Sequence, residues 1–324
     1  MKRMIALLPP LLAGLWCVFM IAGWASPVMA GSWREGTPMT TARALGGAAL
    51  IGEDIYVIGG TGTTGSKAVV ESYDGIGDIW RVQNALPDGM QNFGVAAIDG
   101  RLFVAGGYAS GQPNVAQSSM WTLQPPENVW TEGPKMPSPR TGHGAVAVDG
   151  KLYVIGGKGP DADRVLIYDP AEERWTTGPA AMPQARAQLA VVAVAGKIYA
   201  IGGRGADGAA SARVDIYDTA TRQWSRGADL PKPRQGHVAA VIGGRIHVTG
   251  GENHSPPQTF ADHFALDAGA NRWRTEAAMP TPRHGAVAVA VGGKLIVIGG
   301  ATGAGVFTVF TESDLVEIYT PDVP

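Results

Sequence analysis

A glycine pair recurs six times along this chain, and no other feature constrains the fold as strongly. Consecutive pairs lie 46 to 50 residues apart, and each one closes a short, mostly apolar run such as Leu152-Tyr153-Val154-Ile155. Runs of β-branched and aromatic residues bounded by glycine are typical of buried strands. The six pairs are Gly59-Gly60, Gly106-Gly107, Gly156-Gly157, Gly202-Gly203, Gly250-Gly251 and Gly299-Gly300.

Further strand signals surround each pair. A run of small apolar residues such as Gly144–Val148 precedes the buried run, and a two-residue turn such as Asp149-Gly150 joins them. Such turns supply the positive φ angles of tight hairpins, so the two strands are predicted to be antiparallel neighbours. A third strand ends at a Tyr-Asp pair or a variant of it. A tryptophan stands seven residues beyond the start of that pair in five repeats, at Trp80, Trp130, Trp175, Trp224 and Trp273.

The glycine pair, the tyrosine and the tryptophan at this period resemble the kelch repeat. The resemblance covers about residues 33–324 and implies an all-β, six-bladed β-propeller with four antiparallel strands per blade. The 46 glycines and 23 prolines fit this fold class, because both residue types disfavour helix interiors. The sixth repeat ends before any tryptophan, whereas Trp33 precedes the first inner strand. We therefore expect the Trp33 strand to complete the last blade and close the ring.

The first 30 residues read as an export signal. Lys2 and Arg3 are followed by an apolar stretch to about Trp24 and by small residues at Val28-Met29-Ala30. We predict a signal peptide over 1–30, a propeller domain over 31–324, and a periplasmic or secreted protein. An uncleaved membrane anchor is the alternative, because the apolar stretch has about the 20 residues of a spanning helix. The single cysteine, Cys17, lies in this segment, so the mature chain is predicted to lack disulfides and thiolate chemistry.

Several kinds of partner and cofactor are not expected. The net charge of −2 offers no basic field for nucleic acid. Gly60–Gly65 matches a dinucleotide-binding pattern, but a strand rather than a helix is predicted to follow it, so we expect no nucleotide. His254 and His263 share one segment with acidic residues, yet their spacing is not diagnostic of a metal site and we interpret the segment as a surface loop. No cofactor and no metal are predicted.

In a four-stranded blade with strands a to d, the d–a and b–c connections emerge on the same face. The d–a connections repeat a Met-Pro-x-Pro-Arg motif, as in Met136–Arg140, although Met90 replaces the arginine in the second blade. The five arginines could bind a carboxylate, phosphate or sulfate. They could instead cap carbonyls or pair with acidic neighbours, since a repeated residue often has a repeated structural role. The ligand-binding candidates are Arg43, Arg140, Arg186, Arg234 and Arg283.

The b–c loops differ most between repeats, and variable loops on a rigid scaffold usually carry specificity. Tyr108 in one loop and Phe307 and Phe310 in another are candidate ligand anchors. The leading hypothesis is an exported, non-enzymatic binding module for a protein segment or an envelope glycan. The alternative is an acidic-sugar epimerase or mutarotase that resembles periplasmic N-acetylneuraminate epimerase. A third possibility is a secreted scaffold that assembles through the c–d turns.

Overall fold

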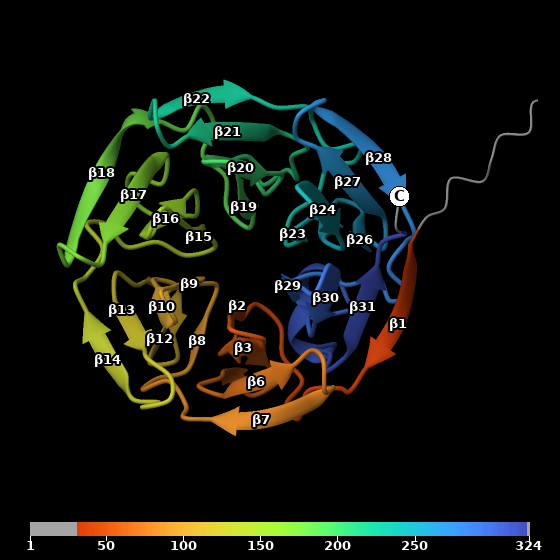
Figure 1. The fold of residues 1–324 in the computed structure, drawn as a ribbon, viewed down its shortest axis with the longest axis horizontal. Coiled ribbons are helices and arrows are strands. Elements are labelled where there is room, and N and C mark those ends of the chain that lie inside the picture. The colour runs from red at the N-terminus through yellow and green to blue at the C-terminus, as the bar shows by residue number, and fades with distance from the viewer. Residues whose placement is uncertain (1–30, 323–324) are drawn as a thin grey trace, which may run out of the picture.

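The computed structural model describes residues 31–322, which form six four-stranded antiparallel sheets around a central channel (Figure 1). The predicted all-β, six-bladed propeller with four antiparallel strands per blade is confirmed. The predicted signal peptide over 1–30, with Cys17, lies outside the described residues. No helix within the described residues is long and apolar enough to cross a membrane.

Strands a, b, c and d of each blade follow one another from the channel outward. Blade 1 comprises β2 (Gly47–Ile51), β3 (Asp54–Ile58), β6 (Val70–Asp74) and β7 (Ile79–Gln83), and blade 2 comprises β9 (Gly94–Ile98), β10 (Arg101–Ala105), β13 (Met120–Leu123) and β14 (Trp130–Gly133). Blade 3 comprises β15 (Gly144–Val148), β16 (Lys151–Ile155), β17 (Arg164–Asp169) and β18 (Arg174–Ala181), and blade 4 comprises β19 (Ala190–Val194), β20 (Lys197–Ile201), β21 (Val214–Asp218) and β22 (Gln223–Arg226). Blade 5 comprises β23 (Val238–Ile242), β24 (Arg245–Thr249), β27 (His263–Asp267) and β28 (Arg272–Glu276), and blade 6 comprises β29 (Val287–Val291), β30 (Lys294–Ile298), β31 (Val316–Thr320) and β1 (Ser32–Gly36).

Short elements fill several of the segments predicted as loops. Most of them are short antiparallel hairpins, in which the b–c segment folds back on itself beside the blade. These elements are β4 (Thr61–Gly62), β5 (Gly65–Ser66), β8 (Met90–Gln91), β11 (Tyr108–Ala109), β12 (Gln112–Ala116), β25 (Glu252–His254), β26 (Pro257–Thr259) and the 3₁₀ helix η1 (Gly305–Phe310).

The N-terminal strand closes the ring as predicted. β1 pairs antiparallel with β31, with Trp33 opposite Tyr319, and Figure 1 shows the two ends of the described chain side by side in blade 6. The Trp33 indole N–H also donates to the carbonyl of Ala277 at 2.8 Å. All six d-strand tryptophans make such a bond, at 2.8 to 3.3 Å, to the connection that precedes the blade or, for Trp224, to Ala180 at the end of β18. The tryptophan therefore joins neighbouring blades at the outer rim.

The glycine pair joins the blades near the channel. The second glycine of each pair donates its N–H to a carbonyl at the start of the next blade, as Gly157 does to Arg186 at 2.8 Å. The first glycine packs against that same carbonyl: a Cβ on Gly156 would lie 2.6 Å from the Arg186 oxygen. All six pairs make this contact, and the acceptor is the repeated arginine or Met90. A side chain at the first glycine would therefore push two blades apart.

A closed circuit of backbone hydrogen bonds encircles the channel. Each blade contributes one residue with positive φ whose N–H donates to the corresponding carbonyl of a neighbouring blade, at 2.6 to 2.9 Å. Six such bonds return to their starting point, which shows the closure of the ring independently of β1. The six residues are Leu45, Asn92, Gly142, Gln188, Gly236 and Gly285.

We predict that Gly156→Ala destabilises the protein much more than Gly150→Ala. Both glycines have φ near +70°, so both alanines carry the left-handed strain of about 1–2 kcal/mol. Only Gly156 also faces a neighbouring blade, whereas a Cβ on Gly150 meets nothing within 4 Å. Overpacking there adds about 1–3 kcal/mol. Urea unfolding of the two variants measures the difference, and equal free energies would contradict the role assigned to the glycine pair.

Candidate functional site at the channel mouth

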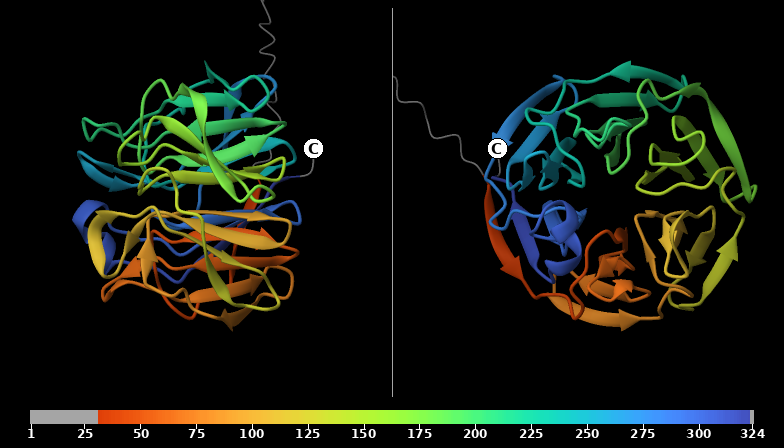
Figure 2. Two further views of the ribbon diagram at one scale, coloured as in Figure 1. Left: turned by 90° about the vertical axis from the view of Figure 1, so that its left-hand side faces the viewer. Right: turned by 180° about the vertical axis from the view of Figure 1, so that it is seen from behind.

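The d–a and b–c segments meet on one face of the ring, as the sequence predicts. On that face the residue after each repeated arginine, or after Met90, forms an antiparallel bridge with the residue after the same blade's glycine pair. We call this set of twelve residues the channel mouth. In the side view of Figure 2 the b–c segments and η1 project from one end of the ring, and the C-terminal end lies at the other. The pairs are Ala44/Thr61, Gln91/Tyr108, Thr141/Lys158, Ala187/Arg204, Gln235/Glu252 and His284/Ala301.

The five predicted ligand-binding arginines are buried inside their blades. None is more than 2% exposed, and their guanidinium groups bond to groups of their own blade. Arg186 shows the pattern: Nε donates to the Gly202 carbonyl at 2.7 Å, and Nη1 pairs with the Asp215 carboxylate at 2.8 Å. Arg43 forms the equivalent pair with Glu71 in blade 1, and Arg283 forms it with Glu317 in blade 6.

One position of strand c holds the acidic partner in three blades, and the residue at that position varies with the blade. It is acidic in blades 1, 4 and 6, but Phe264 occupies it in blade 5, where the ring centre lies 5.1 Å from the Arg234 guanidinium carbon. In blade 3 the position holds Leu166, and Arg140 donates instead to the Asp161 carbonyl at 2.6 Å. Burial lowers the pKa of Arg140 to about 10, which leaves it charged at neutral pH. Of the two roles that the sequence left open for the five arginines, ligand binding and structural pairing, their side chains therefore adopt the structural one.

This placement changes where a ligand-binding site can be sought. The arginine side chains contribute to the interior of each blade rather than to the channel, so binding of an anion by Arg43, Arg140, Arg186, Arg234 or Arg283 stays a prediction without support from their geometry. Tyr108 lies half-buried on β11 at the mouth, and its role as a ligand anchor also stays a prediction. The sequence correctly predicted that the d–a and b–c segments share one face, but it did not show that the arginine side chains are buried inside the blades.

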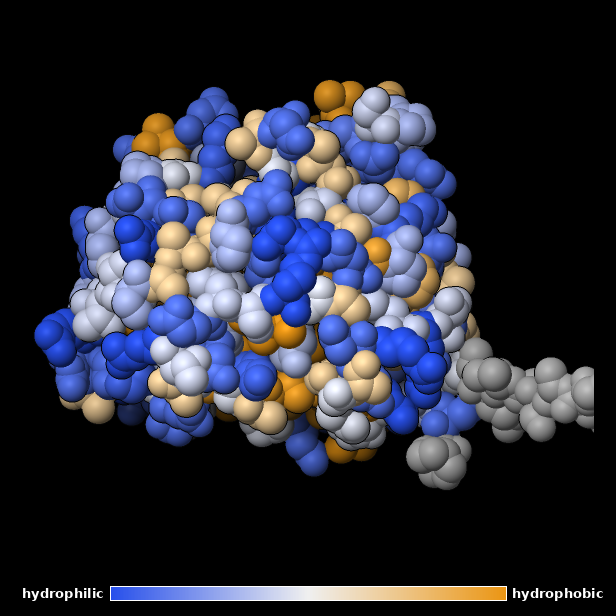
Figure 3. All heavy atoms as spheres, turned by 90° about the horizontal axis from the view of Figure 1, so that it is seen from above, coloured by the Kyte–Doolittle hydropathy of each residue, from blue (hydrophilic) through white to orange (hydrophobic). Residues whose placement is uncertain are grey.

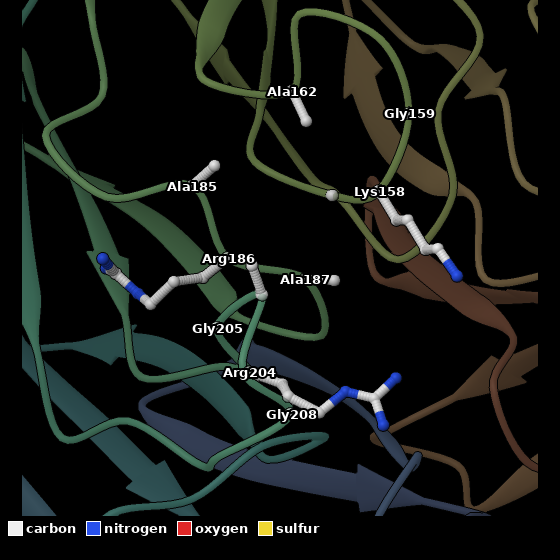
Figure 4. Close-up of a pocket in the computed structure, with 11 residues that line it drawn as sticks. Lys158, Gly159, Ala162, Ala185, Arg186, Ala187, Arg204, Gly205 and Gly208 are labelled. Carbon is white, nitrogen blue, oxygen red and sulfur yellow. The ribbon is translucent and has the colours of Figure 1, made fainter.

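Two cations at the mouth have no such partner. Lys158 of blade 3 and Arg204 of blade 4 border a cavity of about 470 Å³, whose other lining residues are glycines, alanines and part of Arg186. Neither charged group lies within 4.0 Å of a carboxylate of residues 31–322. In Figure 4 their charged ends point to the same side, away from the Arg186 guanidinium. The sequence signal was available, since both residues directly follow a glycine pair.

A buried carboxylate occupies the same position in blade 5. Glu252 is 2% exposed, and His254 Nε2 lies 2.9 Å from its Oε1. Gln235 donates to the same oxygen at 3.3 Å, and the backbone N–H of Gly305 donates to Oε2 at 2.7 Å. His284 Nδ1 lies 3.4 Å away, and burial lowers the pKa of this histidine. The sequence analysis did not join Glu252 and His254 to Gln235, His284 and Gly305, because these residues come from four connections of blades 5 and 6.

The histidine pair considered as a possible metal site is separated by the fold. His254 lies at the mouth, whereas His263 begins β27 and is buried with its Nε2 3.0 Å from His247 Nδ1. The interpretation of both residues as part of one surface loop is therefore wrong for His263, because a strand buries its side chain against Tyr319. Burial lowers the pKa of His263 to about 3. Within residues 31–322 no group of three or more histidine, cysteine or acidic side chains is arranged so that it could hold a metal ion.

An apolar knob stands beside the mouth on blade 6. We define it as the exposed apolar residues of η1, namely Val306, Phe307, Val309 and Phe310, of which the two phenylalanines are 59% and 70% exposed. The knob is fixed in place, because Gly305 donates to Glu252 and the Thr308 hydroxyl lies 3.1 Å from His284 Nε2. The prediction of exposed aromatic residues in this segment is confirmed. Blade 6 lies across the ring from blade 3, so the knob and Lys158 belong to opposite sides of the channel (Figure 1).

A closed ring of six four-stranded blades, joined by glycine pairs and outer tryptophans, defines a kelch β-propeller. The family model for the KLHDC2/KLHL20/DRC7 Kelch-repeats domain matches residues 78–203 and 188–320, which is more than half of the chain. The chain therefore belongs to the kelch-repeat family, whose propellers are typical of protein-interaction modules.

Known proteins are similar to parts of this sequence, and one solved structure is similar to most of this fold. Human Kelch repeat and BTB domain-containing protein 12 is 30% identical over 112 residues, which cover 30% of this chain and 18% of that protein. Beta-scruin of Limulus polyphemus is 29% identical over 107 residues, covering 32% and 12%. The chain thus spans less than a fifth of the length of these relatives. The solved structure of YjhT has a TM-score of 0.74 at 20% identity, covering 87% of this chain and 96% of that one, which shows a shared fold.

We predict that Arg283→Met destabilises the protein by about 3–5 kcal/mol, because it leaves the buried Glu317 carboxylate without its cation. The double variant Arg283→Met/Glu317→Leu should recover at least half of this loss. Methionine and leucine occupy the two positions in blades 2 and 3, so both side chains fit the repeat. Chemical unfolding measures both variants. A double variant no more stable than the single one would show that the charge pair is not the cause.

Proposed function

We propose that this protein is an exported, non-enzymatic binding module that holds a protein segment across the channel mouth. The observation that carries the proposal is the pair of unpartnered cations, Lys158 and Arg204, beside a cavity of about 470 Å³. Unpaired cations next to a concave site favour an anionic group, because charge-assisted hydrogen bonds are stronger than neutral ones. A carboxylate of the bound segment would occupy this end of the mouth.

The apolar knob favours a protein segment over a glycan. Phe307 and Phe310 are exposed on a fixed 3₁₀ helix, and exposed aromatic side chains are common anchors in protein interfaces. An acidic envelope glycan would satisfy the cations but would leave these rings uncovered. A segment with an acidic residue at one end and an apolar residue at the other satisfies both. Export remains a proposal that rests on the sequence of residues 1–30 alone.

We predict that the protein selects acidic residues from an array of extended peptides. The double variant Lys158→Ala/Arg204→Ala should weaken binding of the selected peptide at least about tenfold, because it removes the charge-assisted hydrogen bonds to the acidic residue. The matched control is Lys151→Ala/Lys197→Ala, which removes the same charge from blades 3 and 4 at their a–b turns on the opposite face. The control should bind like the unmodified protein. Fluorescence anisotropy with the selected peptide gives the dissociation constants.

Two results would count against this proposal. If the control loses as much affinity as the mouth variant, net charge rather than the mouth governs binding. If no peptide binds but glucuronate or N-acetylneuraminate raises the melting temperature of the unmodified protein, the ligand is an acidic sugar.

The Glu252 cluster favours acidic-sugar epimerisation or mutarotation as a second candidate function. Opening a sugar ring removes one proton from the anomeric hydroxyl and adds one to the ring oxygen, which requires an acid–base pair. Glu252 and His254 lie 2.9 Å apart, and His254 borders a second cavity of about 390 Å³. Lys158 and Arg204 could then bind the carboxylate of the sugar.

If this second function holds, the protein accelerates anomer exchange of N-acetylneuraminate, and Glu252→Gln slows the exchange by about 100-fold, the contribution of a general base. Glu132→Gln, on the exposed part of β14, is the control and should leave the rate unchanged. Exchange NMR measures the rate directly. No acceleration by the unmodified protein would remove the enzymatic candidate and leave the peptide experiment unaffected.

A further inference from the structure

The interface between blades 5 and 6 differs from the other interfaces of the ring. Each blade turns four positions toward the next blade: the second and fourth residues of the buried b run, the strand c residue opposite the fourth, and the strand d residue opposite that one. In the other five blades the b and c positions hold tyrosine, phenylalanine, isoleucine, alanine, valine or methionine, and the d position holds glycine or glutamine. Blade 5 instead has His247, Thr249, His263 and Glu276.

These four polar side chains are buried. Polar residues are ordinary on the outer wall, as Figure 3 shows for the side of the ring near β22, where hydrophilic residues are interspersed with single hydrophobic ones. His247, Thr249 and His263 are at most 2% exposed, and Glu276 is 7% exposed. Burying a polar group costs stability unless hydrogen bonds compensate it. The apolar residues of the repeat avoid this cost, so packing alone does not account for the four replacements.

Hydrogen bonds fix the protons of the two histidines. The Ala277 carbonyl lies 3.2 Å from His263 Nδ1, and because a carbonyl only accepts, Nδ1 carries the proton of the neutral ring. His263 Nε2 is therefore an acceptor, and His247 Nδ1 donates to it at 3.0 Å. A proton added to His247 buries a charge between the blades. A second proton, on His263, would set two N–H groups against each other.

The same side chains hold the strand that closes the ring. Trp33 of β1 donates to the Ala277 carbonyl, the group that His263 also reaches. Tyr319 of β31 lies opposite Trp33, and its hydroxyl donates to Glu276 Oε2 at 2.8 Å. The Tyr319 ring packs edge-on against His263 with ring centres 4.5 Å apart. We call His247, His263, Glu276 and Tyr319 the closing cluster, because it joins both strands of the β1–β31 pair to blade 5.

The charges around the histidines do not compensate for burial. Glu276 faces His247, but Arg274 pairs with this carboxylate, and Arg245 also faces the ring. His263 faces two cations, Arg234 and Arg274.

Neutral rings therefore fit this interface. Burial lowers the pKa of His247 to about 4 and that of His263 to about 3. Burial also raises the pKa of Tyr319, so its hydroxyl keeps the proton that it donates to Glu276.

We propose that acid opens the ring at the interface between blades 5 and 6, because proton uptake by His247 and His263 separates the closing cluster and releases β1 from blade 5. The proposal does not depend on the function proposed above, since the closing cluster lies among the outer strands of blades 5 and 6 and contributes no residue to the channel mouth (Figure 1).

The direction of the pH dependence follows from the two states. The closed interface keeps both rings neutral, whereas water in the open interface restores the ordinary histidine pKa of about 6.5. The closed form is therefore fully stable above about pH 6.5 and loses stability as the pH falls toward 4 and below. Between pH 7 and pH 5 one such histidine shifts the equilibrium about 25-fold toward the open form, and two shift it about 600-fold.

Other buried histidines provide an internal comparison. His143 lies against Gly94 and Gly106 at the interface between blades 2 and 3, and burial lowers its pKa to about 3. That interface has one such ring, whereas the closing cluster has two and His284 lies at the mouth end of the same interface. The interface between blades 5 and 6 should therefore open first as the pH falls.

Hydrogen exchange of the unmodified full chain at pH 7 and pH 5 tests the proposal. Protection factors, which correct for the intrinsic exchange rate, report local opening. The amides of β27 and β31, on the two sides of the closing cluster, should lose at least about tenfold more protection than those of β13 and β17, on the two sides of the interface between blades 2 and 3. Equal losses in all four strands would show global unfolding and overturn the proposal, as would no loss at β27 and β31.

The repeat supplies a matched variant. His247→Tyr/His263→Val installs the residues that blades 1, 3 and 4 have, and the contact of Tyr153 with Tyr217 shows that a tyrosine fits against the next blade. This variant should reduce the loss of protection at β27 and β31 to that at β13 and β17. His263→Val alone should remove at least about tenfold of the loss, which keeps the test open if the double variant does not fold.

The control is His143→Phe, which places the residue of blade 2, Phe93, at the equivalent position of blade 3. It removes a buried histidine from another interface and should leave the loss at β27 and β31 unchanged. An undiminished loss in the His247 and His263 variants, or an equal reduction by His143→Phe, would overturn the role of the closing cluster.

Discussion

The contact between a glycine pair and the first carbonyl of the next blade is the constraint on which the rest of this structure depends. The first glycine has no room for a Cβ, and the second donates a hydrogen bond to the same oxygen. The repeated arginine acts at the same junction. Its carbonyl accepts the bond from the preceding blade, while its guanidinium caps the glycine carbonyl of its own blade, as Arg186 does with Gly202. One short motif thus holds a blade together and fixes its neighbour.

This arrangement explains why buried charge is tolerated so deep in a small blade. A buried cation is costly unless it is paired and hydrogen-bonded. Arg283 satisfies the condition with the Glu317 carboxylate and three backbone carbonyls. Blade 2 satisfies it by omitting the charge altogether, with Met90 in place of the arginine and Trp121 in place of the acid. In every blade these two positions belong to the packed interior rather than to an anion-binding ring, although blades 3 and 5 keep the arginine with Leu166 or Phe264 in place of the acid.

Features that depart from the repeat are the ones that carry the functional proposals. Lys158, Arg204 and Glu252 share one structural position, which other blades fill with threonine, tyrosine or alanine. The backbone there is the same in every blade, so the side chain can change without cost to the ring. Because the scaffold is regular, a residue that departs from the repeat is easy to recognise.

The sequence by itself determined the number of blades, the four strands of each blade, the closing strand at Trp33 and the face that carries the loops. These follow from local patterns, because strand alternation, hairpin turns and a fixed period are all written in neighbouring residues. Tertiary structure alone decided which charges are free. Arg186 and Arg204 look equally available in the sequence, but Asp215, 29 residues beyond Arg186, reaches the first and no acid of the described chain reaches the second. The Glu252 cluster and the isolation of His263 from His254 also required the fold, since they depend on which side chains two blades bring together or bury.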